Sequence, residues 1–229
     1  MAWFTIERKA DVLSLTSFVL SVIALTHQFV GNVVGPRVGL YAPNLVTLLR
    51  YNYGTDDRPL WGLNVAGIMA YTNAGAPGNN DTILSERIAF KGPTGQPITM
   101  NGYDFYDSYD VPTGSKDHVP VMLGQRVAGL VVVAAGDAVS HGTWFVPYSQ
   151  DCRSLALQGC NSGDNFLSFD HTLATFLSAT AQIELVFETD FLKSGTQRQT
   201  CTIYTKNFDR TAFEQQGWAT FNCFRTAAK

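Results

Sequence analysis

The sequence predicts a mainly β fold, an antiparallel two-sheet β-sandwich of the immunoglobulin-like or jelly-roll-like kind, preceded by a single N-terminal transmembrane helix. Three observations lead to this prediction. Residues 12–36 carry no formal charge, and such a run is long enough to cross a bilayer as a helix. The rest of the chain is a succession of short strand-like segments separated by turns rich in Gly and Pro, which is typical of a sandwich. One later segment has helical periodicity and predicts an amphipathic helix packed on the sandwich.

The N-terminal segment divides the chain into a cytoplasmic N-terminus (1–10), a transmembrane helix (11–34) and an extracytoplasmic β-sandwich domain (35–229). Three interpretations of the segment compete: a retained anchor, a cleaved signal peptide and a soluble core helix. The apolar run exceeds a usual signal-peptide core, and it lacks the charged face that a soluble helix carries. We therefore expect a retained anchor, with Trp3, Phe4 and Tyr41 as interfacial aromatic residues at its ends.

The residues on one side of this helix predict that another helix packs against it. Ser14, Ser17, Ser21, Ala24 and Gln28 recur at steps of three and four, so they form a continuous line of small or polar residues, the serine stripe. Small residues let helices approach closely within a bilayer, and Ser or Gln can hydrogen-bond across the contact. The expected partners are other transmembrane helices, or a second copy of this chain. The alternative is that the hydroxyl groups bond back to their own helix.

The segments that follow residue 43 read mostly as strands. Their expected ranges are 44–53, 60–73, 82–90, 97–110, 125–136, 142–148, 181–192, 199–208 and 217–224. Within 60–73, one face collects Leu63, Val65, Gly67, Met69 and Tyr71. Segment 125–136 is the most apolar, and we expect it to be a central strand.

The amphipathic helix is expected within 164–180. Phe166, Phe169, Leu173, Phe176 and Leu177 recur there at helical spacing, with Ser162 or Asp164 available as the N-cap. Such a helix would cover an open end or edge of the sandwich.

The four cysteines indicate an oxidising compartment. Cys152 and Cys160 enclose a short loop, and Cys201 and Cys223 lie in two late strand-like stretches, so we expect two disulfides. Four buried free thiols are the alternative. With Arg8 and Lys9 before the helix, this predicts a plasma (inner) membrane protein with a cytoplasmic N-terminus and a periplasmic or extracellular C-terminal domain.

The most unusual polar stretch is 103–110. Tyr103, Phe105, Tyr106 and Tyr109 could form a contact surface, while Asp104, Asp107 and Asp110 could contribute oxygens to a calcium site. The spacing matches no EF-hand, and an ordinary strand is the third interpretation. We predict no metal and no cofactor.

The sequence favours binding over catalysis. Ser140 and His141 are adjacent, so on a strand they point to opposite faces and cannot pair as nucleophile and base. No G-x-S-x-G, P-loop or G-x-G-x-x-G pattern occurs. Charged residues are 15% with a net charge of −3 and Lys and Arg are scattered, which argues against nucleic acid.

We therefore expect a non-catalytic accessory or stabilising subunit of a larger membrane protein complex, for example an energy-transducing one. The alternatives are a free-standing membrane-anchored binding module for a ligand or a soluble protein, and an anchored hydrolase.

Overall fold

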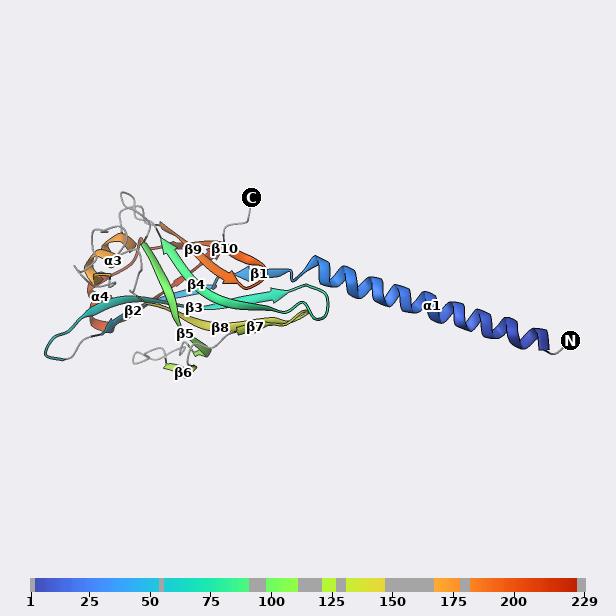
Figure 1. Ribbon diagram of the computed structural model, residues 1–229. Helices are drawn as coiled ribbons and strands as arrows, with labels where there is room; N and C mark the ends of the chain where they lie inside the picture. Colours follow the sequence, from blue (N-terminus) through green and yellow to red (C-terminus); the bar gives the residue numbers. More distant parts are fainter. Residues whose placement is uncertain are drawn as a thin grey trace.

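The computed structural model describes residues 3–53, 56–90, 98–110, 121–126, 131–146, 167–177 and 182–225, and within the N-terminal helix it describes the side chains of residues 12–26 and 29. That helix, α1 (Trp3–Val34), projects alone from a β domain (Figure 1). It passes through Gly31 and ends where Gly35 adopts a φ of 72° and Pro36 prevents continuation. Among the described residues, no helix is long and apolar enough to cross a membrane. The transmembrane part of the predicted architecture is therefore not confirmed.

The β domain is antiparallel, as the alternation of residues predicts. Its strands are β1 (Val38–Tyr41), β2 (Leu45–Asn52), β3 (Trp61–Asn73), β4 (Asp81–Phe90), β5 (Ile98–Asp110), β6 (Val121–Arg126), β7 (Val131–Val133), β8 (Ala138–Val146), β9 (Gln182–Phe191), β10 (Gly195–Tyr204), β11 (Trp218–Asn222) and β12 (Phe224–Arg225).

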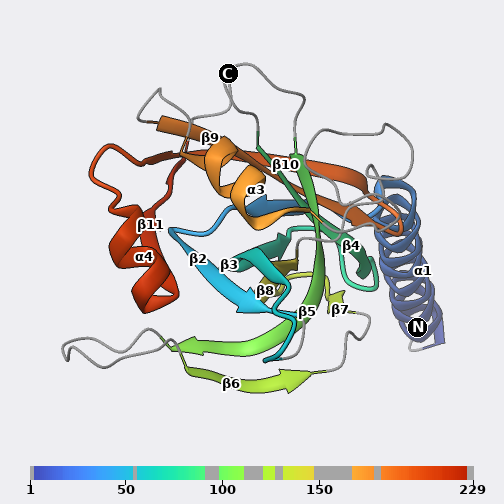
Figure 2. The ribbon, with the colours of Figure 1, turned by 90° about the vertical axis from the view of Figure 1, so that its left-hand side faces the viewer.

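These strands form one continuous sheet in the order β11-β2-β3-β8-β5-β4-β9-β10-β12, with β1 added to β3, β6 to β5 and β7 to β4. The sheet curls over its own core (Figure 2). Phe145 of β8 and Phe187 of β9 have ring centroids 5.8 Å apart, although two strands separate β8 from β9 in the sheet order. The fold is consistent with a sandwich, but the two predicted sheets are one folded sheet.

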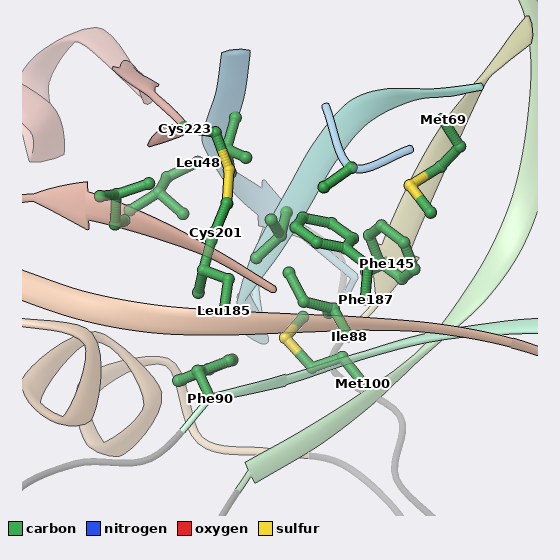
Figure 3. Packing of buried hydrophobic residues seen from close by; sticks show 14 of the residues in the cluster. Leu48, Met69, Ile88, Phe90, Met100, Phe145, Leu185, Phe187, Cys201 and Cys223 are labelled. Carbon is green, nitrogen blue, oxygen red and sulfur yellow. A yellow bond between two sulfur atoms is a disulfide. The ribbon is translucent and has the colours of Figure 1, made fainter. Parts of the chain in front are cut away.

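The core lies between the facing parts of this sheet (Figure 3). Leu63, Val65, Met69 and Tyr71 of β3 are all fully buried, as the alternation in 60–73 predicts. They share the core with aromatic and aliphatic side chains of β2, β4, β8, β9 and β10. Period-two alternation placed these residues correctly because one face of each strand is buried.

Several predicted strands have different limits. Segment 125–136 is not one central strand: β6 ends at Arg126, and the three-residue β7 pairs only with β4 among the described strands. Strand β10 begins at Gly195 instead of residue 199, because the turn after β9 spans only 192–194. Strand β1, which follows α1, was not predicted.

Two short helices, α3 (Phe169–Phe176) and α4 (Arg210–Gln216), cover the end of the domain away from α1 (Figure 1). In α3 the predicted apolar face is buried at Phe169, Leu173 and Phe176. The helix is shorter than expected and its N-cap is Ser168, so the predicted caps Ser162 and Asp164 are wrong. Phe166 lies outside the described residues.

Helix α4 was not predicted, although its signals are in the sequence. The Asp209 carboxylate accepts a hydrogen bond from the backbone N–H of Ala212 at 3.1 Å, as an N-cap residue does. Gly217 ends the helix with a φ of 81°, a left-handed conformation that glycine tolerates.

Candidate functional site

The surface of α1 is the first candidate site, because it is apolar and exposed. Ten large apolar side chains between Val12 and Phe29 are exposed, among them Leu13 (70%), Phe18 (67%) and Phe29 (71%). Fully burying such a side chain contributes roughly 1.5–3 kcal/mol. A contiguous apolar surface of this kind usually marks a contact with protein or lipid.

The serine stripe lies along one side of this helix. Ser14, Ser17, Ser21 and Ala24 are exposed, and the side chain of Gln28 lies outside the described residues. At 100° per residue the five positions fall within an arc of about 80°, and the large apolar side chains occupy the remainder of the circumference. The Ser21 hydroxyl donates to the carbonyl oxygen of Ser17 at 2.9 Å. The stripe is thus defined by the small size of its residues more than by free hydrogen-bond donors.

Two threonines that lie outside the stripe, on other sides of the helix, show the same back-bonding. The Thr16 hydroxyl donates to the carbonyl oxygen of Val12 at 2.8 Å, and the Thr26 hydroxyl donates to that of Val22 at 2.6 Å. These bonds match the alternative interpretation of the hydroxyl groups, in which each is satisfied within its own helix.

The predicted interfacial aromatic residues are widely separated. Trp3 and Phe4 lie in the first turn of α1, and their side chains are outside the described set. Tyr41 ends β1 and is 40% exposed. The guanidinium carbon of Arg225 lies 5.6 Å from the centroid of the Tyr41 ring, so Tyr41 contacts the β domain.

The helix is attached to the β domain through a buried asparagine, Asn73. The connection between α1 and β1 is only 35–37. The Asn73 side chain is 2% exposed, and its Oδ1 accepts from the backbone N–H of Arg37 (3.2 Å) and of Gly75 (2.9 Å). Its Nδ2 donates to the carbonyl oxygens of Asn79 (2.8 Å) and Val133 (3.0 Å). Asn73 therefore joins the connector to the turn between β3 and β4 and to the end of β7.

Further hydrogen bonds hold the same connector. The backbone N–H of Ala74 donates to the carbonyl oxygen of Arg37 at 3.0 Å, and the Asn79 amide donates to that of Gly35 at 3.4 Å. The connector therefore behaves as part of the domain and not as a free linker.

One predicted disulfide is present. Cys201 of β10 is joined to Cys223, between β11 and β12, with a Cα–Cα distance of 5.5 Å. Both residues are buried. Cys152 and Cys160 lie outside the described residues.

The tyrosine-rich stretch forms part of strand β5. Backbone pairing places Phe105 opposite Arg126 of β6 and opposite Thr143 of β8. The side chains of 103–110, which include Tyr103, Tyr106 and Tyr109, lie outside the described residues. The strand interpretation is confirmed for the backbone, while the contact-surface interpretation stays a prediction.

A buried polar cluster, Tyr71–Glu86–His141–Thr143–Thr189, was not predicted from sequence. The Glu86 carboxylate is fully buried and accepts from the Thr143 hydroxyl (2.6 Å), from the Tyr71 hydroxyl and from His141 Nε2 (2.9 Å). The His141 tautomer with its hydrogen on Nε2 donates to this carboxylate. The Tyr71 hydroxyl also lies 3.2 Å from that of Thr189.

This cluster joins four strands, β3, β4, β8 and β9. Burial raises the pKa of the Tyr71 hydroxyl well above its ordinary value, and the charge of Glu86 adds to the shift. The cluster is closely packed, since a Cβ placed on Gly102 would lie 3.0 Å from Thr143 Cγ2. Its role is to hold strands together. Ser140 is exposed and His141 is buried, as expected for neighbours on a strand.

A cleft of about 410 Å³ lies where α3 and α4 meet β2 and the start of β3. The guanidinium carbon of Arg50 lies 3.9 Å from the centroid of the Trp61 ring, and Nη1 donates to the carbonyl oxygen of Glu214 at 2.9 Å. Arg210 pairs with Asp170 at 2.9 Å and with Glu214 at 2.6 Å. Arg210 therefore joins α4 to α3, and the bond from Arg50 to the Glu214 carbonyl joins α4 to β2.

Two comparisons of the sequence with known proteins were negative. No family model matches the chain, and no curated protein matches it. Within the described part of the chain, no group of three or more His, Cys, Asp or Glu side chains could hold a metal ion.

Proposed function

We propose that this protein is a non-catalytic accessory subunit that attaches through α1 to a larger membrane protein complex. The observation that carries the proposal is the exposed apolar surface of α1, which stands clear of the β domain (Figure 1). Its ten large apolar side chains are about half to two-thirds exposed, and covering them contributes on the order of 10 kcal/mol. Neighbouring helices and lipid would cover them together, so α1 does not have to cross a bilayer unaided.

The arrangement of the β domain supports an orientation. The buried Cys201–Cys223 disulfide favours an oxidising compartment for the domain. Arg8 and Lys9 precede the apolar part of α1, which favours a cytoplasmic N-terminus. The domain would then lie on the outer side of the plasma (inner) membrane, held next to its partner by the short connector.

The experiment compares two matched double variants of the tagged full-length chain. S17L/S21L enlarges two residues of the serine stripe, whereas V19L/V22L enlarges two residues on the apolar side of the same helix. Each is expressed in its native cells, extracted in a mild detergent and purified through the tag, and co-purifying membrane proteins are identified by mass spectrometry.

We expect S17L/S21L to lose a stoichiometric membrane partner that the wild type and V19L/V22L retain, because bulk on the stripe prevents close helix packing. Equal retention by both variants would remove the stripe from the interface. Recovery of the wild-type chain as a lone monomer, released from membranes by a carbonate wash, would contradict the accessory-subunit proposal.

A second candidate function, an anchored binding module, is favoured by one observation. The β domain has a cleft of about 490 Å³ beside α4 and β11, on the side of the domain away from α1 (Figure 2). Exchanging α1 for an unrelated apolar helix separates the two candidates. An accessory subunit loses its complex after this exchange, whereas a binding module keeps its activity.

A further inference from the structure

The two ends of the curled sheet meet beside α4 and leave a gap, the seam. Among the described strands, β11 pairs only with β2, and β12 pairs with β10 only at Cys201 and Thr202. The Cys201–Cys223 disulfide joins the two sides of the seam, with a Cα–Cα distance of 5.5 Å. Beyond this bond the seam opens into the 490 Å³ cleft.

The backbone of β11 directs hydrogen-bonding groups into the seam. The N–H of Arg50 donates to the carbonyl oxygen of Gly217 at 2.7 Å, and the N–H of Cys223 donates to that of Asn44 at 2.8 Å. Gly217 and Cys223 therefore point their backbone groups toward β2. Because this direction alternates along an antiparallel strand, the even-numbered residues Trp218, Thr220 and Asn222 point their N–H and C=O groups away from β2.

The edge of β11 that faces away from β2 lacks the usual protection against strand addition. Exposed edges commonly carry charged residues or proline, which discourage pairing with another chain. The sequence of β11 is WATFN, with neither. An unprotected edge that leads into a cleft is suited to receive a strand.

The side chains that line the cleft favour an extended segment with apolar residues. Tyr204 and Phe224 are 58% and 54% exposed, and their ring centroids are 5.5 Å apart. Phe208 and Phe221 stack deeper in the cleft at 5.7 Å. Lys206 and Asp209 are both exposed and line the cleft. The Asp209 carboxylate accepts from the backbone N–H of Ala212 at the start of α4, so Lys206 is the lining charge that an acidic residue of the segment would complement.

We propose that the seam binds an extended segment of a partner protein, which pairs its backbone with β11. The segment places an apolar side chain against Tyr204 and Phe224 and an acidic residue near Lys206. The five residues of β11 span about 17 Å. The volume of 490 Å³ falls within the range of roughly 300–1,000 Å³ found for ligand sites. The proposal is independent of what covers α1.

The test uses full-length protein in dodecyl maltoside micelles and a random seven-residue peptide library displayed on phage. Selected sequences are synthesised with a fluorophore, and their Kd is measured by anisotropy. Two variants at one exposed position form a matched pair: Asn222→Pro removes an N–H that points into the seam, and Asn222→Ala retains it. Peptides methylated at single backbone nitrogens test the same hydrogen bonds from the ligand side.

We expect selected peptides to alternate apolar residues and to include an acidic one. Asn222→Pro should weaken Kd about tenfold, since it loses a hydrogen bond and adds a steric obstruction, and Asn222→Ala should change Kd less than about twofold. N-methylation should abolish binding at alternate residues only, and this result with wild-type protein remains decisive if Asn222→Pro does not fold.

Three results would overturn the proposal. The first is equal binding by the Asn222→Pro and Asn222→Ala variants, combined with no alternation in the effect of N-methylation. The second is the selection of no peptide above background. The third is a dimer, detected by light scattering, that Asn222→Pro makes monomeric, because it would assign the edge to a second copy of the chain.

Discussion

The hydrogen bonds of Asn73 predict how much the helix–domain junction contributes to stability. Replacing Asn73 by Ala removes four hydrogen bonds and leaves two carbonyl oxygens and two N–H groups without this partner. The bonds to Asn79 and Val133 are buried, whereas those from Arg37 and Gly75 are partly buried. At about 1 kcal/mol for each net hydrogen bond, the variant should lose about 2–4 kcal/mol of unfolding free energy.

Two measurements check this prediction in the same detergent solution. Urea denaturation followed by tryptophan fluorescence gives the change in unfolding free energy. Limited trypsin digestion reports on the connector, because Arg37 is exposed and cleavage after it should become faster once its backbone N–H loses Asn73. Asn222→Ala replaces an exposed asparagine that takes no part in these four hydrogen bonds. It is the control and should change stability by less than about 0.5 kcal/mol.

Two results for Asn73→Ala together would refute the role assigned to its hydrogen bonds. If Asn73→Ala changes the unfolding free energy no more than Asn222→Ala does, and cleavage after Arg37 keeps its wild-type rate, then the four hydrogen bonds do not hold the connector. Faster cleavage with unchanged stability would mean that they orient α1 without stabilising the domain.

Three further predictions concern the β domain. Glu86→Ala should lose about 2–4 kcal/mol in urea unfolding, because three buried donors lose their acceptor; a loss below 1 kcal/mol would contradict the role of the cluster. Burial acts to raise the pKa of Asp81, but hydrogen bonds from Ser194, Lys193 and Thr82 outweigh it and lower the pKa below its ordinary 3.8. The stabilisation from Asp81 is therefore present above about pH 4 and is lost as the pH falls through the lowered pKa, so Asp81→Asn should flatten the acid limb of a plot of urea midpoint against pH. Reducing the disulfide, whose cysteines are 22 residues apart, should lower stability by about 3 kcal/mol, and an unchanged melting temperature would argue against this estimate.

The strands were predictable to the extent that burial alternates along them. In β3, four inward positions are fully buried, so a period of two in the sequence identified both the strand and its core face. The limits of β10 and the division of 125–136 depend on pairing with β9 and β4, and a local pattern contains no information about such partners.

The buried cluster shows why part of the candidate site could not be predicted. Glu86, His141 and Tyr71 come from three strands, and 55 positions separate Glu86 from His141. Each is an ordinary residue in its own segment, and only the curled sheet brings them together. Helix α4 was missed because seven residues hold too few turns for periodicity to be recognised, although Asp209 and Gly217 bounded it.

The short connector has a consequence for any partner of this protein. Helix α1 has 32 residues and is therefore about 48 Å long, and the three-residue connector at its end is hydrogen-bonded to the domain through Asn73 and Asn79. A partner that packs on the serine stripe would then meet one predetermined flank of the β domain. The contact with α1 and the contact with the β domain would then act as one preorganised attachment. Once the partner is bound to α1, its effective concentration at the flank of the domain is raised.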